Sequence, residues 1–145
     1  MSLSTSPGMS IRNRIAGTIV AVTPGEVMAT VKVRIEGGQV ITAAITQEAV
    51  TELALAEGTQ VHALVKSTEV ALATGAVDGL SIRNQIPGTV TEVAMGAAMA
   101  TVKVAVRGGE LTSAVTRDAV ADLGLASGSS VVALIKSTEV SLATT

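Results

Sequence analysis

The sequence of 145 residues contains no cysteine and no phenylalanine, tyrosine or tryptophan. Without cysteine the chain has no disulfide, thiolate metal site, thiol nucleophile or iron–sulfur cluster. Without aromatic side chains it offers no surface on which nucleic-acid bases stack, and no aromatic cage. The core must therefore be built from aliphatic side chains, and these binding modes are excluded.

Net charge and long apolar runs are also lacking. Ten Lys and Arg stand against twelve Asp and Glu, giving a formal net charge of −2, so the overall charge does not attract nucleic acid or an acidic membrane. No uncharged apolar run approaches the roughly 20 residues that a spanning helix needs. Residues 1–9 lack the charged and apolar regions of a signal peptide. We therefore expect a cytoplasmic protein that binds neither nucleic acid nor membranes.

A tandem repeat organises the chain. The segment Ser-Ile-Arg-Asn occurs at residues 10–13 and again at 81–84, and Lys-Ser-Thr-Glu-Val occurs at 66–70 and again at 136–140. The repeat predicts two domains of one fold, residues 10–73 and 81–143, joined by a linker of mostly small residues at 74–80. Because neighbouring positions have diverged, a residue that shared chemistry needs should occur in both copies.

Polar and apolar residues alternate within each copy, which is the pattern of half-buried strands. Residues 30–35 show this alternation, a Gly-Gly turn follows, and further strands are expected near 17–22, 40–45, 61–65 and 70–72. Thr46 precedes a segment with one apolar face, which predicts a short helix of about two turns. This order predicts an all-β fold with short helices: two tandem OB-like five-stranded Greek-key barrels. Such small domains gain stability by self-association.

The residues that both copies share contain no catalytic set. His62 corresponds to Val132 in the second copy, so a solvated or packed histidine is the simpler interpretation. The carboxylates shared in the predicted helices lie near the helix starts, where acidic residues are favoured electrostatically. No nucleophile–base pair and no zinc-type ligand set emerges. We therefore expect neither an enzyme nor a site for a bare metal cation.

Both copies do share groups suited to an oxyanion. A tetrahedral oxyanion only accepts hydrogen bonds, so Arg or Lys, hydroxyl groups and backbone N–H groups bind it. Thr46 and Thr116, at the predicted helix starts, can offer such N–H groups. On spacing alone, a solvated strand entry and a polar turn are the better explanation of the remaining residues, but the retention of both segments in both copies favours a binding site. These residues are Ser10, Arg12, Asn13, Lys66 and Ser67, and in the second copy Ser81, Arg83, Asn84, Lys136 and Ser137.

Three segments together resemble the Mop domain of the molybdate-binding molbindin family. They are S-x-R-N-x-x-x-G at 10–17 and 81–88, A-[IV]-T-x-[ED]-A-V at 44–50 and 114–120, and A-L-[IV]-K-S-T-E-V at 63–70 and 133–140. The resemblance implies reversible binding of molybdate, with tungstate as a near-isosteric substitute, for storage and homeostasis. It implies the oxyanion as ligand and no organic cofactor. An oxyanion-sensing regulatory module that acts on a protein partner is the alternative.

The resemblance also implies sites shared between domains of a homo-oligomer, which for tandem members is a trimer. One domain would contribute the Ser and Arg of S-x-R-N. Direct contact with the ligand, orientation of the arginine and a second class of site all stay open for Asn13 and Asn84. The difference between Ala16 and Pro87 could make the two halves unequal. The neighbouring domain would contribute a helix start and a Lys-Ser turn: Thr46, Ala49, Lys66 and Ser67, or Thr116, Ala119, Lys136 and Ser137.

Overall fold

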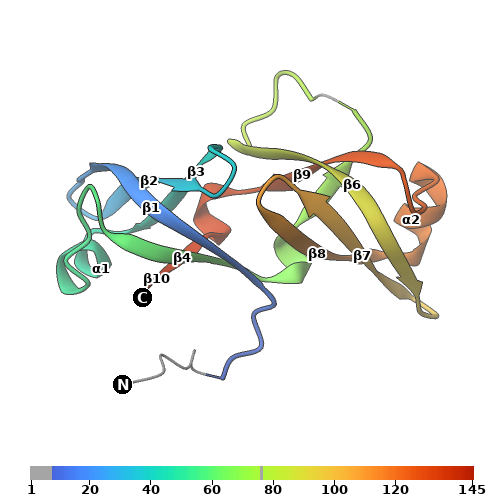
Figure 1. The fold of residues 1–145 in the computed structure, drawn as a ribbon, viewed down its shortest axis with the longest axis horizontal. Coiled ribbons are helices and arrows are strands. Elements are labelled where there is room, and N and C mark those ends of the chain that lie inside the picture. Colours follow the sequence, from blue (N-terminus) through green and yellow to red (C-terminus); the bar gives the residue numbers. More distant parts are fainter. Residues whose placement is uncertain (1–7, 76) are drawn as a thin grey trace.

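The structure is a computed structural model that describes residues 8–75 and 77–145 (Figure 1). Residues 1–7, which belong to the N-terminal segment without signal-peptide features, and residue 76 of the predicted linker lie outside the described residues. Each copy follows the predicted order of three strands, a helix and two strands, with a short 3-10 helix before its last strand. The elements are β1 (Asn13–Thr23), β2 (Met28–Ile35), β3 (Val40–Thr46), α1 (Gln47–Glu52), β4 (Gln60–Val65), η1 (Ser67–Glu69) and β5 (Ala71–Ala73), then β6 (Asn84–Met95), β7 (Met99–Val106), β8 (Gly109–Thr116), α2 (Arg117–Leu123), β9 (Ser130–Ile135), η2 (Ser137–Glu139) and β10 (Ser141–Thr144).

The last strands of the two copies are exchanged. One antiparallel sheet has the order β10-β4-β1-β2-β3 and the other has the order β5-β9-β6-β7-β8. Ser141 of β10 pairs with Leu64, and Ala71 of β5 pairs with Leu134, so each copy completes the sheet of the other (Figure 1). The predicted fold class, all-β with two five-stranded units and short helices, is confirmed. The boundaries 10–73 and 81–143 describe the sequence repeat, and each sheet draws one strand from across them.

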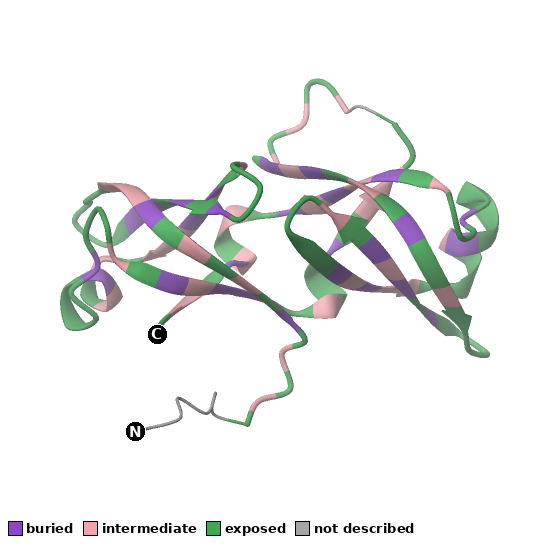
Figure 2. Ribbon diagram, viewed as in Figure 1, coloured by how far each residue is buried: buried purple, intermediate pink, exposed green. Residues whose placement is uncertain are grey.

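Alternation of side chains explains the strands. Along β2, Val31, Val33 and Ile35 are buried while Lys32 and Arg34 are exposed, as expected for a strand with one face on the core. Figure 2 shows the same alternation of buried and exposed residues along strands of both lobes. The two-residue period in the sequence therefore reports which face of each strand packs inward.

The predicted helix is present in both copies and is capped as expected. Thr46 precedes α1, and its Oγ1 accepts a hydrogen bond from the N–H of Ala49, which satisfies one of the free donors at the helix start.

Strand β1 begins at Asn13, earlier than the predicted 17, because its first residues pair with β4. The start of β1 could not be predicted from local periodicity, because it depends on pairing with a strand that is distant in the sequence.

An aliphatic core connects the two lobes. Its larger cluster combines Val31 and Val65 of the first copy with Ile86, Leu111 and Ile135 of the second. A smaller cluster of buried residues comes from the second copy alone. The lobes are therefore joined by shared apolar packing as well as by exchanged strands. Within the described part of the chain, no helix is long and apolar enough to cross a membrane.

The tips of the β2–β3 and β7–β8 hairpins pack against each other between the lobes. Gly37 has a φ of +95° and Gly108 a φ of +88°, in the left-handed region that favours glycine. A Cβ on Gly37 would meet Arg107, and a Cβ on Gly108 would meet the backbone oxygen of Glu36. Both positions therefore need glycine for the turn and for the close approach of the other hairpin.

We expect Gly108→Ala to destabilise the protein more than Gly38→Ala. Gly38 has a φ of +94°, but a Cβ added there would have no atom within 4 Å, so its replacement carries only backbone strain, about 1–2 kcal/mol. Gly108→Ala adds a steric clash with the other hairpin and should cost about 2–4 kcal/mol in all. Urea unfolding measures both. Equal losses would mean that the hairpin tips are not in contact in solution.

Candidate functional site

Strand pairing places the two predicted binding segments of each copy side by side. Asn13, at the start of β1, pairs with Val65, at the end of β4. Arg12 directly precedes β1 and Lys66 directly follows β4. The two positively charged residues therefore lie at neighbouring strand ends. The second copy repeats the arrangement through the pairing of β6 with β9. Each copy thus brings an Arg and a Lys-Ser turn together from segments about fifty residues apart in sequence.

The charged groups of these segments face solvent. Arg12, Lys66, Arg83 and Lys136 are exposed, as are Ser10 and Ser81. Ser67 and Ser137 are half-buried and begin η1 and η2. The Oγ of Ser67 is buried, and no described residue forms a hydrogen bond with it. An unsatisfied buried hydroxyl costs free energy, so Ser67 is a group that gains from an added acceptor or donor.

Asn13 and Asn84 are buried and fasten each lobe to the other. The Nδ2 of Asn13 donates to the carbonyl of Thr112 at 2.8 Å, and its Oδ1 accepts from the N–H of Thr112 at 2.7 Å. Asn84 makes the same two bonds with Thr42, at 2.8 and 2.7 Å. Thr112 and Thr42 lie on β8 and β3, the edge strands of their sheets, and edge strands leave such backbone groups unpaired. Of the roles open for these asparagines, the geometry favours holding the segment that carries the arginine.

The predicted helix-start residues lie away from the Arg–Lys pairs. The Oγ1 of Thr46 accepts a hydrogen bond from the N–H of Ala49, and the Oγ1 of Thr116 accepts one from the N–H of Ala119, each at 3.1 Å. The two threonines therefore cap α1 and α2. Figure 1 shows α1 and α2 at opposite ends of the molecule, whereas β1 and β6 begin near the junction of the lobes. One chain therefore brings the Arg and Lys-Ser segments together but does not bring the helix starts to them.

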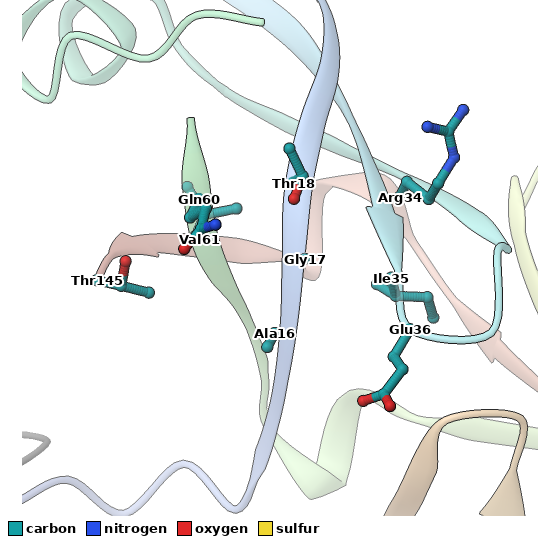
Figure 3. Close-up of a pocket in the computed structure, with 9 residues that line it drawn as sticks. All are labelled: Ala16, Gly17, Thr18, Arg34, Ile35, Glu36, Gln60, Val61 and Thr145. Atoms are coloured by element: carbon teal, nitrogen blue, oxygen red, sulfur yellow. The ribbon is translucent and has the colours of Figure 1, made fainter. Parts of the chain in front are cut away.

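An open pocket on the first lobe contains none of these residues. Its volume is about 520 Å³, and Arg34 and Glu36 supply its charges but point in different directions (Figure 3). The corresponding pocket of the second lobe has Ala105 in the place of Arg34. The chemistry that both copies share therefore does not lie in these pockets. The first pocket is lined by Ala16, Gly17, Thr18, Arg34, Ile35, Glu36, Gln60, Val61 and Thr145.

His62 is half-buried on β4 and faces the space between the lobes. It lines a pocket of about 300 Å³ with Arg14, Glu36, Arg107 and Glu110, so its surroundings carry charges of both signs. Over residues 8–75 and 77–145, no group of three or more His, Cys, Asp or Glu side chains is placed to hold a metal ion.

Comparison with known proteins places the chain among molybdenum-related proteins. The TOBE domain model matches residues 9–72 and 80–142. The chain is 40% identical over 145 residues to the molybdenum transport protein ModE of Herbaspirillum seropedicae, covering 99% of this chain and 52% of that protein. It is 40% identical over 136 residues to the molybdenum-pterin-binding protein MopB of Rhodobacter capsulatus, covering 92% and 50%. The chain thus spans about half the length of these relatives.

A solved structure matches almost the whole chain. It is a crystal structure of the cytoplasmic molybdate-binding protein ModG with molybdate bound, 42% identical in sequence, with a TM-score of 0.91. The match covers 94% of this chain and 99% of that one. The paired lobes described above are therefore the architecture of a known molybdate-binding protein.

We expect Asn13→Ala to lower the free energy of unfolding by about 1–3 kcal/mol, because the N–H and C=O of Thr112 lose their partners in a part-buried position. Arg12→Ala, at the exposed neighbouring position, should change it by less than about 0.5 kcal/mol. Urea unfolding without ligand measures both variants. If Asn13→Ala were as stable as the parent, the amide would not fasten the lobes in solution, and direct ligand contact would become the better interpretation.

Proposed function

The chain belongs to the TOBE-domain family as a tandem Mop-domain molbindin, and from this premise we propose that it binds molybdate reversibly for storage and homeostasis. Tungstate, a near-isosteric oxyanion, would occupy the same sites. The protein would act in the cytoplasm without catalysing a reaction. It would use the oxyanion as its ligand, with no organic cofactor, nucleic acid or membrane partner. The likeness to ModG over nearly the whole chain supports this proposal.

The observation that carries the proposal is the duplicated Arg–Lys–Ser cluster. In each copy an exposed Arg and an exposed Lys lie at adjacent strand ends, and a half-buried Ser follows the Lys in the sequence. These groups supply permanent charge and hydroxyl donors to a ligand that only accepts hydrogen bonds. The clusters would be Ser10, Arg12, Lys66 and Ser67 in the first copy, and Ser81, Arg83, Lys136 and Ser137 in the second. Asn13 and Asn84 would hold them in place.

We further propose that the oxyanion sites are completed by other copies of the chain. The helix starts at Thr46 and Ala49, and at Thr116 and Ala119, lie at the two ends of the molecule. If they contribute to sites that contain an Arg–Lys pair, that pair belongs to a neighbouring subunit. The family resemblance favours a homotrimer. This assembly would also cover apolar side chains exposed at the ends, among them Met28 and Met99.

Calorimetric titration of the protein with sodium molybdate tests the proposal. We expect saturable binding that persists in excess sulfate and in excess phosphate. Arg12→Ala combined with Arg83→Ala should weaken binding about 10-fold or more, because each charge-assisted hydrogen bond contributes roughly 1.5–3 kcal/mol. Both arginines are exposed, so thermal unfolding without ligand should be unchanged.

His62→Val is the matched control, since the second copy already has Val132 at this position. It should leave molybdate affinity unchanged. Absence of binding in the parent, or complete displacement by sulfate, would overturn the molybdate assignment. Unchanged affinity in the double arginine variant would leave molybdate binding in place and refute the assigned residues.

A sensing role is the second candidate function. The chain covers only about half of the ModE and MopB relatives, so domains of this kind also occur within longer proteins. In that role, molybdate binding would change the affinity for a protein partner. Affinity purification from cell extract with and without molybdate distinguishes the two roles. A stoichiometric partner recovered in a molybdate-dependent way supports sensing, and equal recovery under both conditions contradicts it.

A further inference from the structure

One buried position distinguishes the two otherwise similar clusters. The turn η1, which begins with Ser67, packs on β8, and the turn η2, which begins with Ser137, packs on β3. On β8 the buried residue that faces this junction is Ser113, and the equivalent residue on β3 is Ala43. Both side chains are fully buried. The strands that support the two turns therefore differ at this position by a single hydroxyl group.

The hydroxyl of Ser113 fastens the first turn to the second lobe. Its Oγ donates a hydrogen bond to the carbonyl of Val70 at 2.5 Å, and Val70 is the residue that caps the end of η1. Val140, the counterpart of Val70, caps the end of η2, but Ala43 has no group that can make this bond. The first turn is thus held by a buried hydrogen bond that the second turn does not have.

Two consecutive residues of β8 hold the first cluster from both sides. Thr112 binds the amide of Asn13, the residue after Arg12. Ser113 binds the end of the turn that carries Lys66 and Ser67. In the second cluster, Thr42 binds Asn84 in the same way. The second attachment is missing there, because Ala43 stands in the place of Ser113.

We propose that Ser113 is a positioning residue that makes the oxyanion site of Arg12, Lys66 and Ser67 the tighter of the two in each chain. The proposal rests on the proposed function. A turn already held in one place loses less conformational freedom when a ligand binds, which raises affinity. The Oγ of Ser67 is buried and has no hydrogen-bond partner, and it lies on the turn whose end Ser113 holds. Ser113 itself is fully buried and acts only through Val70.

Proteins with one functional cluster test this inference. Arg83→Ala with Lys136→Ala keeps the first cluster, and Arg12→Ala with Lys66→Ala keeps the second. In calorimetric titration with sodium molybdate, we expect the first-cluster protein to bind about 5-fold more tightly, the effect of one buried hydrogen bond. Adding Ser113→Ala should remove this advantage in the first-cluster protein and leave the second-cluster protein unchanged.

The chain supplies its own controls for folding. Alanine already occupies the equivalent buried site at position 43, so Ser113→Ala introduces a residue that this packing accommodates. The reverse change, Ala43→Ser, should tighten binding only in the second-cluster protein. Equal affinities of the two one-cluster proteins, or an equal loss in both on Ser113→Ala, would overturn the inference while leaving molybdate binding intact. A parent protein that binds no molybdate would instead overturn the proposed function, and this inference with it.

Discussion

The exchange of the last strands is the constraint on which the rest of the structure depends. Strands β5 and β10 are short and complete the sheet of the opposite copy. The chain must cross between lobes just before each of these strands, and the crossing segments are η1 and η2. The Lys-Ser turns therefore lie at the junction because the fold is completed there. The connection that completes each sheet also positions the candidate binding groups.

The exchange also compensates for a core without aromatic side chains. Each repeat has about 64 residues, and domains of this size bury a smaller fraction of their surface on folding than larger domains do. In the structure, Ile86, Leu111 and Ile135 of the second copy join the main buried cluster of the first. The two asparagine amides satisfy backbone groups on the edge strands, which would otherwise be open to pairing with other chains. Aliphatic packing, strand exchange and the hydrogen bonds to the edge strands all connect the two lobes.

Local features of the fold could be predicted from the sequence, and long-range ones could not. Alternation identified the strands, Thr46 identified the helix start, and the glycine pairs identified the hairpin turns, because each depends on neighbouring residues. The exchange could not be predicted, since residues 66–70 and 136–140, which lead into the exchanged strands, are identical and give no signal that assigns either strand to a particular sheet. The same limit applies to Asn13, which retention in both copies marks as important. An amide group fits an oxyanion and an edge strand equally well, and only its position beside Thr112 distinguishes the two roles.

Residues that the two copies share stand out in the sequence, whereas a residue that occurs in one copy only does not. Ser113 is of the second kind, although it makes a fully buried hydrogen bond between the lobes. In an assembly of identical single-repeat chains, every exchanged strand would meet the same residue, and the sites would be equal by symmetry. Joining two copies in one chain removes that symmetry, because β5 always meets the lobe with Ser113 and β10 always meets the lobe with Ala43. Duplication therefore allows one fold to hold two candidate clusters with different supports at fixed positions, and a change at a single buried residue is sufficient to make the supports different.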